Sequence, residues 1–288
     1  MASNLQEAGY DLVVNDIRRS AAEPHLDAGA VWADSAAEVA HAADVVFTSL
    51  PTPPDVESVA NTMLPAMDAG KVYFDLSTNS PTLVRQLHAA FSQRGLHLLD
   101  APVSGGPAGA KSGKLAIWVG GDQEVFERHK KLLSAIGDQV MYVGPIGAGS
   151  IAKLVHNVSG YMIQCALAEA FTMGVKAGVE PLALWQAVRQ GAVGRQRTFD
   201  RLPDHFLSAR FDPPDFALRL AHKDVSLATG VAREHGVPMR MGHLALDELT
   251  EAMGRGWASR DSRVAMLLQE ERAGLEIRVD EERLRQAT

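Results

Sequence analysis

The first half of the chain alternates short apolar, β-rich runs with helical stretches, and this alternation constrains the fold more than any other feature. Strands that alternate with helices build a mostly parallel sheet covered by helices, and ligands bind at the carboxyl ends of such strands. We therefore expect an α/β nucleotide-binding architecture in this half. The expected strands are residues 11–15, 44–50, 71–76, 96–100, 115–120 and 139–143, with helices such as 81–94 and 122–136 between them.

The second half of the chain lacks strand patterns and is expected to be all helical. A long helix over residues 150–177 follows the glycine-rich stretch 144–149 and connects the two halves. We place a domain boundary there, with a nucleotide-binding domain over residues 1–146 and a helical domain over 147–288. The further expected helices are 181–190, 217–234, 239–253 and 259–273, and the charged stretch 275–288 is expected to be a frayed helix end or a solvated tail.

Composition excludes several classes of function. The 288 residues carry a net charge of -7, which gives no reason to expect a basic surface for nucleic acid or for an acidic membrane. No apolar run approaches the roughly 18 residues of a membrane span, and no secretory signal is visible. With Cys165 as the one cysteine, a disulfide within the chain is impossible, and no histidine pair has the spacing of a helical metal site. We expect a cytoplasmic protein without a metal.

The stretch "DAPVSGGPAGAKSG", residues 100–113, is the most informative motif. Ser104 and the adjacent Gly105 and Gly106 follow an expected strand. Backbone N–H groups exposed by two glycines at the end of a strand can converge on a carboxylate or a phosphate. The motif predicts an anion-binding turn, although a plain glycine-rich loop is the alternative.

The second motif is "GAGSIAKLVHN", residues 147–157, at the start of the long expected helix. Lys153 and Asn157 are four residues apart and so lie on one helical face. A lysine in a dry site beside a cationic cofactor has a lowered pKa, which suits a general acid or base for an alcohol hydroxyl. A solvated lysine is the alternative. The third motif, "AHKDVSLA", places Lys223 on a later helix, either facing a substrate carboxylate or forming a surface ion pair.

In this order the three motifs resemble the β-hydroxyacid dehydrogenase family, which includes 3-hydroxyisobutyrate dehydrogenase, and the resemblance covers nearly the whole chain. It implies a Rossmann-like domain followed by a helical domain, and a dehydrogenase that oxidises a short 3-hydroxyacid. A hydride would pass to a nicotinamide while Lys153 takes the hydroxyl proton and Asn157 supports both partners. The substrate carboxylate would be held by Ser104, Gly105, Gly106 and Lys223.

The resemblance also predicts the cofactor loops. "SLPTPPDVESV" resembles the loop that lies along the cofactor, with Leu50 and Pro51, and "DLSTNSP" resembles the loop that holds Ser77 and Thr78 near the nicotinamide. Lys223 is included among the cofactor contacts. Asp16, at the end of an expected strand, would accept hydrogen bonds from the ribose of NAD. Arg18 and Arg19 follow closely, so NADP stays possible.

The sequence departs from the family pattern in one place. His156 precedes Asn157, where many close relatives have a second asparagine. "KLVHN" in this respect resembles 6-phosphogluconate dehydrogenase, whose helical domain is much larger. The substrate could therefore be a sugar acid or a dicarboxylic hydroxyacid. Imine reductases share the architecture but usually lack a lysine at the position of Lys153.

The start of the chain is unusual for such a fold. Residues 1–8 read as the tail of a helix capped at Gly9, and no strand or G-x-G-x-x-G turn precedes them. We expect that about a dozen residues, one strand and its turn, are missing. A wrong start, a truncation and a real loss are the explanations. A cofactor-deficient homologue retained for binding or assembly is accordingly the alternative function.

The long helix carries more apolar surface than a small helical cap would bury. This surface predicts a homodimer or homotetramer, with a helix buried in the core of one chain as the alternative.

Overall fold

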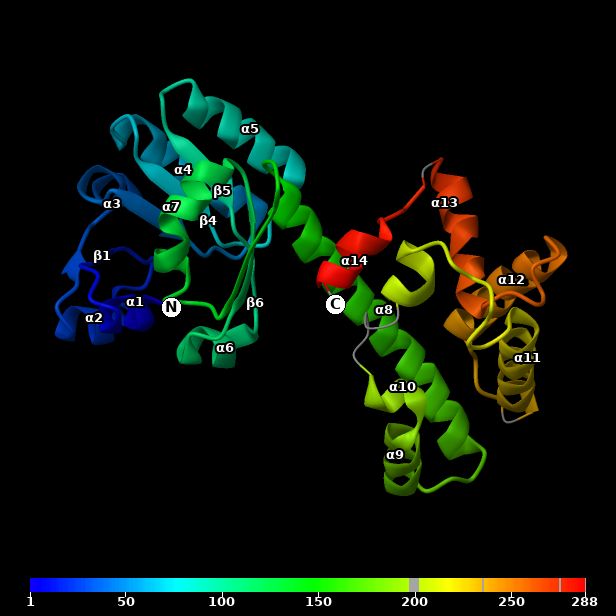
Figure 1. Cartoon of the computed structure of the whole chain (residues 1–288). Coiled ribbons are helices and arrows are strands. Elements are labelled where there is room, and N and C mark those ends of the chain that lie inside the picture. The colour runs from blue at the N-terminus through cyan, green and yellow to red at the C-terminus, as the bar shows by residue number, and fades with distance from the viewer. Residues whose placement is uncertain (197–201, 235, 275, 288) are drawn as a thin grey trace. The chain divides into compact units, whose positions relative to one another are not determined.

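The computed structural model describes residues 1–196, 202–234, 236–274 and 276–287, and the chain forms two compact units, 1–159 and 160–288 (Figure 1). The first unit contains the strands. They are β1 (Val13–Val14), β2 (Val31–Trp32), β3 (Val45–Thr48), β4 (Val72–Asp75), β5 (His97–Asp100), β6 (Val103–Ser104), β7 (Ala116–Gly120) and β8 (Gln139–Gly144).

The strands form two sheets. β1 and β2 are a parallel pair, and the other six have the order β3-β4-β5-β7-β6, with β8 paired to β7. β3, β4 and β5 run parallel to one another, β7 is antiparallel to β5 and β6, and β8 is parallel to β7. The expected α/β class with a mostly parallel sheet is therefore confirmed.

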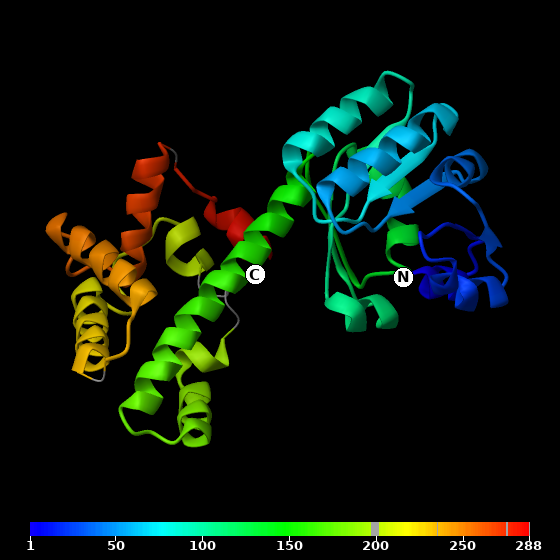
Figure 2. The same ribbon diagram turned by 180° about the vertical axis from the view of Figure 1, so that it is seen from behind.

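Helices cover both faces of the larger sheet, as alternate strand residues require. On one face, Tyr73 and Leu98 pack against Phe91 of α5; the helix α5 lies towards the viewer in Figure 2. On the other face, Phe74 packs with Phe126 of α7. The helices of this unit are α1 (Ala2–Glu7), α2 (Glu23–Asp27), α3 (Ala36–Ala42), α4 (Pro53–Met63), α5 (Pro81–Ser92), α6 (Gly106–Ser112) and α7 (Gln123–Leu133), with 3₁₀ turns at Arg19–Ala21 and Leu64–Ala66.

Local sequence signals set the helix starts. Thr52, Ser80 and Asp122 each accept a hydrogen bond from a backbone amide of the first turn of α4, α5 and α7. Prolines follow the first two of these caps, where the missing N–H is not needed. The expected capping of the first helix is also found, since α1 is followed by Gly9 with a φ of +86°.

Three short elements were not expected. β2 and β6 have two residues each, too few to show an alternating pattern. α6 begins at Gly106, inside the stretch interpreted as an anion-binding turn or a plain glycine-rich loop. The glycines and proline of this stretch hide a helical segment that ends at Gly113 with a φ of +68°. Ser104 is thus the last residue of a strand, and Gly105 is the cap of a helix.

The second unit is helical, as predicted. α8 (Ala148–Lys176) begins in the first unit and continues into the second. The remaining elements are α9 (Pro181–Gln190), α10 (Ala192–Arg195), a π-helical turn at Pro203–Leu207, α11 (Leu218–Glu234), α12 (Arg240–Gly254), a 3₁₀ segment at Ser262–Met266, α13 (Leu267–Ala273) and α14 (Glu281–Ala287). Among the described helices, none is long and apolar enough to cross a membrane.

One expected helix in this unit is wrong at its start. The segment expected as a helix from residue 259 is helical only from Ser262. The reason is Asp261, whose buried carboxylate caps the 3₁₀ segment by accepting from the amide of Arg263 and also accepts from the amide of Phe216. These bonds fix a turn that a helical pattern cannot reveal.

Candidate functional site

The start of α8 is fixed by a carboxylate at the end of a strand. Asp100, the last residue of β5, is 1 % exposed and accepts hydrogen bonds from the amides of Gly147 at 2.8 Å and Ser150 at 2.6 Å. Burial raises the pKa of Asp100, while these amide bonds oppose the rise. Asp100 thus satisfies amides that the first helical turn leaves without a partner within the helix.

Two glycines allow α8 to approach the sheet closely. A Cβ on Gly149 would overlap the carbonyl oxygen of Trp118 and lie 2.7 Å from that of Asp100. A Cβ on Gly120 of β7 would lie 2.5 Å from the Asp100 carboxylate and 2.8 Å from the amide of Gly149. Any side chain at either position would push the helix away from β5 and β7.

Gly149 starts a stripe on α8 that continues through Lys153 and His156. These residues have the i, i+4, i+7 spacing of one helical face, and Asn157 lies beside them. Lys153 is half-buried, and burial lowers its pKa. The sequence-based expectation that this lysine has a lowered pKa agrees with its position.

The other end of the stripe, at His156, contacts Ser104 of the segment 104–106, which we call the "SGG" turn. The hydroxyl of Ser104 and Nε2 of His156 are 3.2 Å apart, and the His156 ring lies 5.2 Å from the ring of Trp118. Because Gly149 contacts the backbone of Trp118 and His156 contacts its ring, Lys153 lies between two points where α8 meets β6 and β7. The structure therefore brings Lys153, Asn157 and Ser104 to one region of the first unit.

The two glycines after Ser104 have backbone conformations that favour glycine. Gly105 has a φ of +134° and Gly106 a φ of +61°, and both are exposed. A Cβ on Gly105 would lie 3.1 Å from Leu115. The expected turn after the strand is present, with the first residues of α6 beside Ser104.

The expected cofactor loops lie side by side at the carboxyl ends of β3 and β4. The amide of Leu50 donates to the hydroxyl of Ser77 at 2.9 Å. Ser77 is 4 % exposed, so its hydroxyl joins the loops, while Thr78 and Pro51 are exposed. Asp75, which the sequence did not single out, is the buried centre of this edge.

Asp75 accepts hydrogen bonds from three neighbours that belong to both strand ends. The hydroxyl of Thr48 lies 3.1 Å from its carboxylate, the amide of Ser77 at 3.0 Å and the side-chain amide of Asn79 at 2.9 Å. The edge where a nucleotide would bind is thus held by internal hydrogen bonds, which leaves Thr78 available to a ligand.

Asp16 follows β1 and is exposed. One of its oxygens accepts from the amide of Arg18 at 2.8 Å, so the second oxygen faces solvent. Arg19 stacks on Trp32 at 4.8 Å and is 4.0 Å from Asp34. An exposed carboxylate oxygen is therefore present at Asp16, and Arg19, one of the two candidate phosphate-binding arginines, already contacts Trp32 and Asp34.

Lys223 lies on α11 in the second unit. Its side chain lies outside the described part of the chain, so its contacts with substrate or cofactor stay a prediction. His156, Asp75 and the helix-fixing role of Asp100 were missed because each depends on partners far away in the sequence. His156 did stand out as a departure from the family pattern, and that was the available signal.

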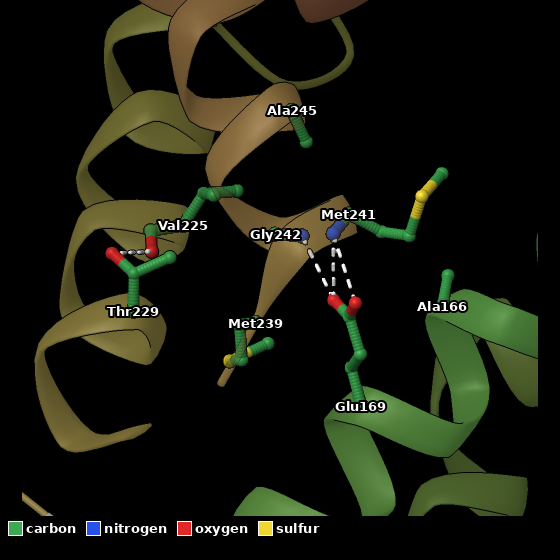
Figure 3. A pocket seen from close by; sticks show the side chains of 8 residues that line it. All are labelled: Ala166, Glu169, Val225, Thr229, Met239, Met241, Gly242 and Ala245. Carbon is green, nitrogen blue, oxygen red and sulfur yellow. Dashed lines mark hydrogen bonds between the residues drawn. The ribbon is translucent and has the colours of Figure 1, made fainter. Parts of the chain in front are cut away.

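The second unit contains a cavity of about 350 Å³ between α8, α11 and α12, shown in Figure 3. Its charged residue is Glu169, which accepts from the amides of Met241 at 2.9 Å and Gly242 at 3.1 Å at the start of α12. None of the residues predicted for catalysis lines it. Glu169 here ties two helices together, in the way that Asp100 ties α8 to the sheet.

Comparison with known proteins identifies the class. Residues 1–144 match the NAD-binding domain of 6-phosphogluconate dehydrogenase, and residues 147–268 match a domain described as NAD-binding of NADP-dependent 3-hydroxyisobutyrate dehydrogenase. The first match begins at residue 1 and so gives no support to the expectation that a strand and turn are missing before Met1. This is an NAD(P)-binding oxidoreductase architecture.

Individual relatives cover nearly the whole chain. An NAD-dependent L-serine dehydrogenase of Pseudomonas aeruginosa is 36 % identical over 93 % of both chains, and a 2-(hydroxymethyl)glutarate dehydrogenase of Eubacterium barkeri is 32 % identical over 96 % of this chain and 93 % of the relative. The structure of Mycobacterium tuberculosis 3-hydroxyisobutyrate dehydrogenase with L-serine superimposes with a TM-score of 0.64 at 30 % identity, covering 93 % and 94 % of the two chains. The chain belongs to the β-hydroxyacid dehydrogenase family.

Proposed function

We propose that the protein oxidises a 2-substituted 3-hydroxypropanoate to the corresponding aldehyde, with NAD as the oxidant. L-serine, 3-hydroxyisobutyrate and 2-(hydroxymethyl)glutarate, the acids in the names of its relatives, all carry a hydroxymethyl group on the carbon next to a carboxylate. They differ in the second substituent of that carbon. A short 3-hydroxyacid is therefore the substrate class, and a dicarboxylic member of it stays included.

The observation that carries the proposal is the position of Lys153. The residue is half-buried, burial lowers its pKa, and it lies on the stripe of α8 that reaches Ser104 through His156. In the proposed reaction the neutral amine takes the hydroxyl proton of the substrate as the C3–H bond breaks. Bound NAD supplies the acceptor for the hydride. Asn157, on the same face, orients the amine and the substrate hydroxyl.

The substrate carboxylate is assigned to the "SGG" turn. The hydroxyl of Ser104 and the exposed backbone of Gly105 and Gly106 provide hydrogen-bond donors beside the stripe of α8. Lys223 would add a positive charge, as the family resemblance implies. With the carboxylate held at this turn, the adjacent hydroxymethyl group is left to meet Lys153.

The cofactor residues fit NAD better than NADP. Asp16 keeps an unoccupied carboxylate oxygen for the ribose hydroxyls, and this charge repels a 2′-phosphate. Arg19 is stacked on Trp32 and close to Asp34, which leaves Arg18 as the nearby cation. Leu50, Pro51, Ser77 and Thr78 would line the cofactor along the ends of β3 and β4.

We also propose that a second copy covers α8, in a homodimer or homotetramer. Seven large apolar residues of this helix are between 37 % and 53 % exposed: Ile151, Leu154, Val155, Met162, Ile163, Leu167 and Val175. Large apolar side chains left exposed along a helix are typical of an interface. Light scattering behind a sizing column should give at least twice the 30.9 kDa of one chain; a monomer would contradict the assignment.

The function is tested by following NADH at 340 nm with the purified protein. L-serine, 3-hydroxyisobutyrate and 2-(hydroxymethyl)glutarate are each offered with NAD and with NADP. We expect turnover with at least one acid, and a higher kcat/KM with NAD. Binding of NADH without turnover of any acid would support the non-catalytic alternative instead.

A further inference from the structure

The contact between His156 and Ser104 is not explained by folding alone. His156 is exposed, and Ser104 is half-buried at the end of β6, 52 positions earlier in the chain. An exposed histidine on a helix has little packing to lose when it is replaced. The contact instead joins the proposed catalytic helix to the residue proposed to hold the substrate.

We propose that His156 is a positioning residue that directs the hydroxyl hydrogen of Ser104 toward the substrate carboxylate. A serine hydroxyl has one hydrogen and two lone pairs, and its hydrogen rotates to suit its partners. When Nε2 of His156 donates to the Ser104 oxygen, it occupies one lone pair and leaves the hydroxyl hydrogen to be donated to another acceptor. A carboxylate is the strongest acceptor for such a hydrogen.

Trp118 determines where the imidazole lies. Its ring is 5.2 Å from that of His156 at an interplanar angle of 50°, and its carbonyl oxygen lies against Gly149 at the start of the same stripe. The close approach at Gly149 fixes the backbone of α8 against β7, and the ring contact places the His156 imidazole beside Trp118. In this position Nε2 of His156 lies 3.2 Å from the hydroxyl oxygen of Ser104.

This assignment rests on the proposed function for the identity of the ligand. It goes further by assigning a role in carboxylate recognition to a residue that touches neither the reacting carbon nor the hydride. The consequence is a specific kinetic signature: the loss of the histidine nitrogen should weaken binding of the acid while the proton transfer by Lys153 proceeds.

Two variants separate the nitrogen from the ring. His156→Phe keeps a ring against Trp118 and removes the donor, whereas His156→Gln keeps an amide donor near the position of Nε2 and removes the ring. We expect His156→Phe to raise KM for L-serine or 3-hydroxyisobutyrate about tenfold, the effect of one hydrogen bond to a charged group. Its kcat should change less than about threefold, with KM for NAD unchanged, and His156→Gln should restore most of the binding.

A double variant tests whether His156 acts through the serine. Ser104→Ala raises KM, and adding His156→Phe to it should raise KM no further, because both changes remove the same interaction. His41→Phe, at an exposed histidine of α3, is the matched control and should leave all constants unchanged. Additive effects, or a His156→Phe variant with the KM of the unaltered protein, would overturn the inference while leaving the dehydrogenase function intact.

A measurement without turnover keeps the two proposals distinguishable. The ¹⁵N resonances of the His156 imidazole report which nitrogen carries the proton. Ser104→Ala should shift them, and those of His41 should stay in place. If no hydroxyacid is oxidised, the proposed function fails, and the resonances alone decide whether His156 is held by Ser104; unchanged resonances would refute the contact.

Discussion

The carboxylate of Asp100 holds the amide of Ser150 at 2.6 Å, so the last residue of β5 fixes the first turn of the helix that carries Lys153. The same strand leads into the turn that contains Ser104. One buried side chain thus sets the register between the proposed proton acceptor and the proposed carboxylate site. This relationship lies entirely within the first unit.

Replacing Asp100 should therefore affect stability and catalysis together. Asp100→Ala leaves the buried amides of Gly147 and Ser150 without partners, and the expected loss in unfolding free energy is about 2 to 4 kcal/mol. Because α8 would then shift, kcat/KM should fall as well. Urea denaturation and steady-state rates provide the two readouts.

Asp122→Ala is the matched control for this prediction. Asp122 also accepts from two amides, those of Glu124 and Val125 at the start of α7, but its cap is exposed and outside the site. Its loss should lower stability by about 1 kcal/mol and leave kcat/KM unchanged. Equal kinetic effects of the two variants would argue against a special role for Asp100.

The close approach of α8 to the sheet gives a second prediction. Gly149→Ala places a Cβ against the carbonyl oxygens of Trp118 and Asp100, which are backbone atoms with little room to move. We expect a loss of about 1 to 3 kcal/mol from overpacking, with a lower kcat/KM. In the control Gly254→Ala the new Cβ meets nothing within 4 Å, so that variant should be neutral or gain up to about 1 kcal/mol. Similar melting curves for both would contradict the packing account.

Acid stability of the second unit should depend on Asp261. Burial raises the pKa of this carboxyl, but hydrogen bonds from the amides of Arg263 and Phe216 and the charge of Arg263 outweigh burial, and the net pKa is lowered. Because the pKa of Asp261 is lower in the folded protein than in the unfolded chain, the carboxylate stabilises the protein at any pH above the unfolded-state pKa. This contribution is lost as the pH falls through the folded-state pKa.

Asp261→Asn should therefore lower the unfolding free energy by about 1.5 to 3 kcal/mol at neutral pH, and by less in acid. Urea titrations at neutral pH and at successively lower values measure the difference. Asp212→Asn, which breaks an exposed ion pair with Arg260, should cost less than about 1 kcal/mol. If Asp261→Asn lowered the unfolding free energy by the same amount at every pH, ionisation of the Asp261 carboxyl would be excluded as the cause of the loss.

The lowered pKa of Lys153 predicts a pH profile. Oxidation needs the neutral amine, so kcat/KM should rise with pH along a limb that lies below the ordinary range of a lysine. Because the unfolded chain binds this proton more tightly, stability also rises with pH between the folded and unfolded pKa values. Lys153→Met should be at least as stable as the unaltered protein at neutral pH, and its stability advantage should disappear in strong base.

The larger elements could be predicted from sequence because their apolar patterns are long. The strand from Val72 to Asp75 and the helix from Pro181 to Gln190 lie within the expected ranges. The site was predicted as a set of residues through the family motifs, which place Lys153 on a helix and Ser104 after a strand. The motifs gave the types of the site residues and their order along the chain.

The connections between these residues could not be predicted in this way. The bond from Asp100 to α8, the contact of Ser104 with His156 and the carboxylate of Asp261 at a helix start all join positions far apart in the chain. A periodic pattern reports which face of an element is apolar, but not which polar group meets which amide. These contacts require the packed fold.

The most direct test of the central claim is kcat of Lys153→Met, compared with the unaltered protein at saturating NAD and hydroxyacid. Lys176→Met, at an exposed lysine near the end of the same helix, is the control and should retain full activity. Removal of a positioned base should lower kcat by roughly 10² or more, while the melting temperature is maintained. A Lys153→Met variant that turns over like Lys176→Met would contradict the assignment of Lys153 as the group that takes the substrate's proton.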